Sequence, residues 1–107
     1  MKRHGQLIGL NKEKLEEYKS YHAEAWPEIT AKIKDCRIQN YTIFHKDGML
    51  FAYFEYTGDD FEADMARMAA DKKTQEWWDI MKPMQEPWAG RAEGEWWAEM
   101  EEVFHLD

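Results

Sequence analysis

The chain has 107 residues and a net charge of −8, and its six Trp, five Tyr and five Phe exceed what one small core needs. This length predicts a single domain over residues 1–107. The negative charge argues against a partner made of nucleic acid or anionic membrane, both of which attract clustered Lys and Arg. The surplus of aromatic side chains favours a pocket or an interface for an uncharged partner.

The single cysteine bears on where the protein works. Cys36 has no partner for an internal disulfide, which is typical of proteins in a reducing compartment. The chain opens on Met1-Lys2-Arg3-His4 without an apolar signal core, and no apolar run approaches membrane length. We therefore expect a cytoplasmic protein that is not embedded in a membrane.

The N-terminal third predicts a strand followed by an interrupted helix. Residues 6–10 are an apolar run typical of a strand, and Asn11 can cap the helical periodicity that continues to about residue 36. Pro27 breaks this periodicity, because proline lacks a backbone donor and restricts the chain before it. We expect a kink at Trp26-Pro27, with Pro27 opening a second helix.

The middle of the chain predicts a β-hairpin. Residues 38–45 and 49–56 are rich in β-branched and aromatic side chains, and Asp47-Gly48 between them is a strong turn signal. Side chains alternate along a strand, so Tyr41 belongs to the face opposite Phe44.

Two further helices and a last strand are predicted. Asp59 or Asp60 begins the first helix, since Asp59-x-x-Glu62 has the spacing of a capping box. A second helix is expected from Thr74 to about Met84. Residues 85–97 should be irregular, and residues 99–106 alternate as a strand would.

The resulting order, βαββαβ, predicts an α+β, ferredoxin-like fold in which helices cover one face of an antiparallel sheet. The other sheet face needs a cover, and in so short a chain we expect a second copy to provide it. Phe44, Phe51 and Tyr53 are the residues expected on that interface.

The candidate functional residues surround one imidazole. Tyr18, His22 and Trp26 recur every four residues and therefore share one helix face. A histidine in this setting is either a structural residue bonded to a backbone carbonyl or the acid–base group of a pocket, and the spacing leaves both open. The aromatic set as a whole suits a neutral sugar, whose ring packs on an indole while Tyr or His bonds its hydroxyls. The full set is Tyr18, His22, Trp26, Tyr41, Trp77 and Trp78.

Two alternatives apply to these residues. Trp77 and Trp78 are adjacent and project from different faces of a helix, so one or both can equally be core or interface anchors.

The four histidines lack the close spacing of a zinc or iron motif, and no Gly-rich phosphate loop is present. We therefore expect neither a metal nor a cofactor.

With these residues in view, the chain resembles the L-rhamnose mutarotases along nearly its whole length. The resemblance is carried by Tyr18-x-x-x-His22-x-x-x-Trp26-Pro27-Glu28, Asn40-Tyr41, Leu50-Phe51-Ala52-Tyr53-Phe54-Glu55, Gln75-x-Trp77-Trp78-x-x-Met81 and Glu101-Glu102-Val103-Phe104. It implies a dimeric α+β barrel and a homodimer that interconverts the α and β anomers of a 6-deoxy sugar without a metal or cofactor.

The resemblance also implies roles by position. His22 would be the acid–base group, with Tyr18, Tyr41, Trp77 and Trp78 around the sugar. Trp26 and Asn40 are further candidate contacts. Ring opening needs one acid and one base, and an imidazole with a pKa near 6.5 can serve as either at neutral pH. Either Tyr18 or Tyr41 could relay the second proton.

One segment departs from the family. Residues 87–97 are richer in Trp than the polar loop associated with these mutarotases. This leaves L-fucose or a related deoxyhexose as an alternative substrate. The fold also hosts cofactor-free monooxygenases and haem-degrading proteins, and a sugar-binding module without catalysis is a third possibility.

Overall fold

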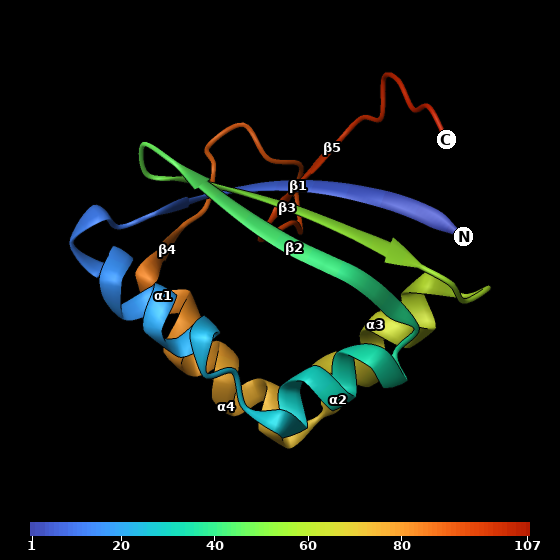
Figure 1. Ribbon diagram of the computed structural model, residues 1–107, viewed down its shortest axis with the longest axis horizontal. Helices are drawn as coiled ribbons and strands as arrows, with labels where there is room; N and C mark the ends of the chain where they lie inside the picture. Colours follow the sequence, from blue (N-terminus) through green and yellow to red (C-terminus); the bar gives the residue numbers. More distant parts are fainter.

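The computed structural model describes all residues from 1 to 107, and its strands form one antiparallel sheet. The sheet has the order β2-β3-β1-β4, and β5 also pairs with β1. Figure 1 shows the helices gathered on one side of this sheet. The predicted ferredoxin-like α+β arrangement is confirmed. The strands are β1 Lys2–Leu10, β2 Ile38–Lys46, β3 Met49–Tyr56, β4 Gln85–Glu86 and β5 Ala98–Met100.

The helices divide where the sequence predicts a break. Trp26 is extended, with a φ of −61° and a ψ of 133°, and Pro27 occupies the first turn of α2. Proline is tolerated there because that position needs no backbone donor. The helices are α1 Leu15–Ala23, α2 Pro27–Asp35, α3 Phe61–Ala70 and α4 Lys72–Met81, and the short 3-10 turns are η1 Lys12–Lys14 and η2 Lys82–Met84.

The hairpin between β2 and β3 forms as predicted. Asp47 and Gly48 have positive φ angles of 50° and 81°, the backbone that a tight hairpin turn requires. The register pairs Phe44 with Phe51 and is interrupted by a bulge between Gln39 and Thr42. The hairpin therefore aligns Phe44 and Phe51 on the same sheet face.

Strands β4 and β5 lie end to end along the free edge of β1. Gln85 of β4 pairs with Leu10 of β1, and Ala98 of β5 pairs with Leu7 of β1. Both strands are antiparallel to β1, so they form one edge strand that residues 87–97 interrupt.

Two predicted boundaries need correction, and one of two predicted helix starts is selected. Strand β1 begins at Lys2, because residues 2–5 pair with β3 although they lack the apolar run seen in residues 6–10. Helix α4 begins at Lys72, where the Asp71 side chain accepts a hydrogen bond from the backbone N–H of Thr74 at 3.0 Å. Helix α3 starts at the second of the two predicted residues: Asp60 is the cap and accepts from the N–H of Ala63 at 3.1 Å, so the capping residue is not Asp59.

The predicted strand over residues 99–106 is largely wrong. Pairing with β1 stops at Met100, and the remaining residues lie on the side of the sheet away from the helices (Figure 1). Val103, Phe104 and Leu106 are 79–86% exposed. An alternating pattern indicates a half-buried strand without specifying its partner, and this chain provides no partner beyond Met100.

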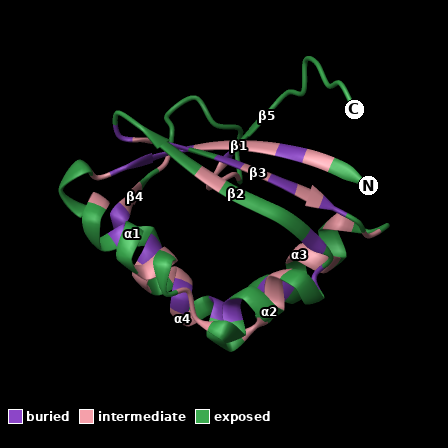
Figure 2. Ribbon diagram, viewed as in Figure 1, coloured by how far each residue is buried: buried purple, intermediate pink, exposed green.

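The core lies between the sheet and the helices, as the buried positions in Figure 2 show. One cluster joins Ile8, Leu10 and Leu50 of the sheet to Trp77 and Met81 of α4. A second cluster, which includes Phe54 and Met68, fills the other end. Because α1 and α4 both pack on the first cluster, their side chains are held against one end of the sheet.

Candidate active site

Helix α1 positions Tyr18 and His22 one turn apart. The His22 Nδ1 atom lies 2.8 Å from the Tyr18 backbone oxygen, and the two rings stack with centroids 4.4 Å apart. A carbonyl oxygen only accepts, so Nδ1 must carry the hydrogen of this bond. In the neutral imidazole, Nε2 is then left with a free lone pair.

Helix α4 brings Trp77 against this imidazole. Trp77 is 7% exposed, and its ring meets His22 edge-on at a centroid distance of 5.5 Å. Trp26, at the start of α2, meets the same indole at 5.2 Å, and Tyr21 meets it at 6.0 Å. The Trp26-Pro27 break therefore places a second indole against Trp77, the indole that meets the imidazole.

Strand β2 contributes Tyr41. The bulge between Gln39 and Thr42 carries Tyr41, whose ring packs at 5.4 Å from Phe54 on the helix-covered side. Although 37% of Tyr41 is exposed, its hydroxyl is buried. This burial is the main cause that raises the pKa of the hydroxyl, and the charge of the nearby Tyr18 is a smaller cause. The two tyrosine hydroxyls are thus close enough to influence each other.

Trp78 and Asn40 have other neighbours. Trp78 packs against both core clusters, and the Lys82 ammonium lies 5.0 Å from its ring centroid. Asn40, with a φ of 51°, donates to the Glu55 carboxylate at 2.7 Å. Glu55 also accepts from Tyr53 at 2.7 Å, on the face away from the helices. The structure therefore groups Tyr18, His22, Trp26, Tyr41 and Trp77, but it does not bring Asn40 to them.

Burial sets the protonation of the central pair. It lowers the pKa of His22, and the bond to the Tyr18 carbonyl opposes this only in part, so the imidazole is neutral at pH 7. Burial raises the pKa of Tyr18, while the hydrogen bond from Gln85 lowers it. A neutral imidazole beside a protonated phenol is an acid–base pair in the states that proton transfer requires.

Sequence reasoning missed two residues that bond this group. Gln85 Nε2 donates to the Tyr18 hydroxyl at 3.0 Å, and Trp96 Nε1 donates to Gln85 Oε1 at 2.7 Å. The signal in the sequence was the Trp-rich segment itself, but nothing in it indicated which indole turns inward.

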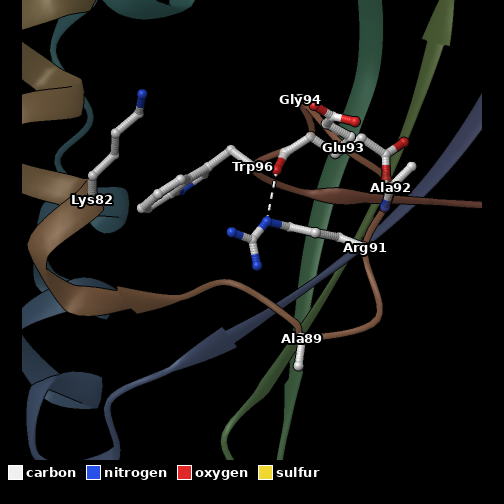
Figure 3. Close-up of a pocket in the computed structure, with 8 residues that line it drawn as sticks. Lys82, Ala89, Arg91, Ala92, Glu93, Gly94 and Trp96 are labelled. Carbon is white, nitrogen blue, oxygen red and sulfur yellow. Dashed lines mark hydrogen bonds between the residues drawn. The ribbon is translucent and has the colours of Figure 1, made fainter.

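Trp96 also lines a surface hollow of about 620 Å³. Figure 3 shows Trp96 between Lys82 and Arg91, with Arg91 directed at the backbone of the same segment. The hollow is separate from the aromatic group around His22, and Trp96 is the residue that connects them.

No three His, Cys, Asp or Glu side chains converge as a metal site would need. None of the helices has the length and apolar character needed to span a bilayer.

Fold and site together define a ferredoxin-like α+β protein of the dimeric α+β barrel class, with a neutral imidazole enclosed by aromatic rings. The tetracenomycin F2 cyclase of Streptomyces glaucescens shares this fold, with a TM-score of 0.76 and 14% identity over 100% of this chain and 98% of that one. That likeness concerns the fold alone, because one fold serves many functions.

More specific relatives identify the family. The family model for L-rhamnose mutarotase matches residues 3–106. The L-rhamnose mutarotase of Lactiplantibacillus plantarum is 35% identical over 109 aligned positions that span 100% of both chains. The crystal structure of L-rhamnose mutarotase from Formosa agariphila covers 100% of both chains with a TM-score of 0.79 and 27% identity. The chain belongs to the L-rhamnose mutarotase family.

Proposed function

We propose that this protein is an L-rhamnose mutarotase, an isomerase that interconverts the α and β anomers of the free sugar. Family membership supports the reaction. The observation that carries its mechanism is the 2.8 Å bond from His22 Nδ1 to the Tyr18 carbonyl, which leaves Nε2 as a free base among aromatic rings.

The reaction begins with proton removal from the anomeric hydroxyl by His22 Nε2. As the bond between the anomeric carbon and the ring oxygen breaks, the ring oxygen takes the hydroxyl proton of Tyr18, and the open-chain aldehyde forms. The aldehyde then rotates, so that its other face meets the sugar hydroxyl formed from the ring oxygen. When the ring closes again, this sugar hydroxyl returns its proton to Tyr18. The new anomeric oxygen takes the proton from His22. No atom or electron is gained or lost, and His22 and Tyr18 carry both protons, so the proposed steps use no metal or cofactor.

Tyr18 is a better second proton carrier than Tyr41. The Gln85 amide donates to the Tyr18 oxygen and so favours the phenolate that Tyr18 becomes after giving up its proton. The Tyr41 hydroxyl receives no such hydrogen bond, and burial raises its pKa. Tyr41 is therefore assigned to sugar binding.

The aromatic rings bind the sugar by its C–H faces. Trp77 presents its indole beside the imidazole, and the Trp26 indole packs against Trp77. Indoles pack well against the apolar face of a pyranose. Trp78 is proposed as a further contact that the Lys82 ammonium holds in place.

The sugar itself is tested by comparing three substrates. The methyl group of L-rhamnose should lie against Trp or Met side chains, where the added hydroxyl of L-mannose would have no partner. An unpaired polar group costs about 1–3 kcal/mol, which slows L-mannose by roughly tenfold or more. Saturation-transfer NMR on L-rhamnose, L-mannose and L-fucose measures anomer exchange directly. Fastest exchange with L-fucose would favour the alternative sugar, and no exchange with any of them would overturn the proposed function.

We also propose that the protein is a cytoplasmic homodimer. The outer sheet face carries exposed Phe44 and Phe51, and a second copy of the same face would cover them. The cytoplasmic location is supported by Cys36, a buried thiol without a disulfide partner.

A further inference from the structure

The orientation of the Gln85 amide is set by Trp96. An indole N–H can only donate, so the 2.7 Å contact from Trp96 Nε1 must be to the amide oxygen of Gln85. The amide nitrogen is then the atom that lies 3.0 Å from the Tyr18 hydroxyl. An amide nitrogen only donates, so the Tyr18 oxygen is the acceptor of this bond.

The Tyr18 hydrogen is consequently free for another acceptor. The Tyr18 oxygen accepts from Gln85, and no other hydrogen bond joins this hydroxyl to the chain. Its ring stacks on His22, so the phenol and the imidazole whose Nε2 holds a lone pair belong to the same face of α1. The pair thus offers one donor and one acceptor to the same ligand.

Trp96 is itself held on two sides. Lys82 Nζ lies 5.2 Å from its ring centroid and 5.0 Å from that of Trp78, so one ammonium contacts both indoles. The segment before Trp96 is held by Arg91, which donates to the backbone oxygen of Glu95 at 2.8 Å (Figure 3). Arg91 also donates to the backbone oxygen of Trp88 at 3.0 Å. The contacts of Lys82 and Arg91 therefore fix the position from which the Trp96 N–H donates to Gln85.

We propose that Gln85 and Trp96 are positioning residues that hold Tyr18 as a hydrogen donor to the ring oxygen of the sugar. This inference rests on the proposed function and assigns a role to the Trp-rich segment 87–97. Without the indole donor, the Gln85 amide can rotate and present its oxygen to Tyr18. The phenol then donates to Gln85, and its hydrogen is lost to the sugar.

The first test is Trp96→Phe, which keeps an aromatic ring and removes the N–H donor. We expect kcat for L-rhamnose exchange to fall on the order of tenfold, as loss of one aligned hydrogen bond would produce, with little change in KM. The matched control is Trp97→Phe, a half-buried indole of the same segment that packs on the core and makes no hydrogen bond to Gln85. It should exchange at the wild-type rate.

A double-mutant cycle separates positioning from packing. In a Tyr18→Phe background there is no hydroxyl to orient, so adding Trp96→Phe should lower the rate no further. If the two losses instead multiply, Trp96 acts through packing alone and the inference is wrong. Exchange by the wild type is the reference for both outcomes, and its absence would overturn the proposed function rather than this inference.

Gln85→Glu gives an independent readout through pH. Its carboxylate still accepts from Trp96 but also accepts from Tyr18, which withdraws the hydrogen from the sugar. Once protonated, the same carboxyl can donate to Tyr18 again. The rate of the variant relative to wild type should therefore rise as pH falls through the pKa of the introduced group. A ratio that is constant with pH would contradict the proposed role.

Discussion

His22 is a histidine whose tautomer and charge are both set by its surroundings. The Tyr18 carbonyl accepts the Nδ1 hydrogen at 2.8 Å, and burial lowers the imidazole pKa. The sequence leaves open a structural and a catalytic role for His22, and the two roles can belong to different nitrogens of the same ring. Nδ1 makes the structural bond, and Nε2 is the atom to which we assign the proposed proton transfer.

Replacing His22 with Ala tests this division. The variant loses the proposed proton carrier but keeps Tyr18 and Trp77, so anomer exchange should fall by about 10²- to 10⁴-fold. The lost bond is within one helical turn, and the free energy of unfolding should fall by only about 1 kcal/mol. Saturation-transfer NMR and thermal unfolding measure the two quantities. His105→Ala, in the exposed C-terminal tail, is the control, and near-normal exchange by a folded His22→Ala protein would remove His22 from the mechanism.

The exchange rate should also depend on pH with a defined sign. Because the pKa of His22 is lowered, the base form persists below the ordinary imidazole pKa of about 6.5. The rate should stay level from pH 8 to about 6.5 and decrease only at lower pH. The unfolded chain binds this proton more readily, so stability also falls as pH drops below about 6.5. A rate that already halves at pH 7 would contradict the lowered pKa.

At the scale of elements, short side chains define where the helices begin. Asn11, Asp60 and Asp71 each accept a hydrogen bond from a backbone N–H two or three residues later, and Pro27 opens α2. These starts orient the residues that follow. Helix α4, capped by Asp71, turns Trp77 toward His22, and α2 begins directly after Trp26.

The cap of α3 gives a test with a built-in comparison. Asp60→Ala removes the acceptor of the Ala63 N–H and should lower the free energy of unfolding by about 1 kcal/mol in a denaturant titration. Asp59→Ala removes the same charge from the neighbouring position, where no such hydrogen bond forms, and should change stability by less than about 0.5 kcal/mol. Equal losses in the two variants would mean that charge, and not capping, stabilises this helix start.

At the scale of the whole molecule, the two sheet faces differ in their cover. The helices bury one face, whereas Phe44 of β2 is 62% exposed on the other, which also carries half-exposed Met100 of β5. The exposed tail after β5 lies on the same side (Figure 2), and it contains the exposed Val103 and Phe104. Exposed apolar groups gathered on one face are typical of an interface between subunits.

Phe44→Glu should therefore weaken the proposed dimer, because it adds a charge to an apolar contact. An interface of more than roughly 1,000 Å² is expected for the wild type, which should be dimeric at micromolar concentration by light scattering. Trp88→Glu alters an exposed indole outside the sheet and should leave the mass unchanged. A wild-type protein that is monomeric at these concentrations would contradict the dimer proposal.

The sequence by itself determined the features that depend on near neighbours in the chain. Helical spacing unites Tyr18 and His22, proline and its predecessor divide α1 from α2, and Asp47-Gly48 turns the hairpin, because each follows from local backbone preferences. The family resemblance added the pairing of this helix with Trp77.

Only the tertiary structure decided which distant side chains meet. It turned Trp77 toward His22 and Trp78 toward both core clusters, it directed Asn40 to Glu55, and it ended β5 at Met100. The contact of Gln85 with Trp96 and Tyr18 was likewise invisible in the sequence. These contacts join residues that lie far apart in the chain, so they depend on how whole elements pack, and no local pattern encodes that packing.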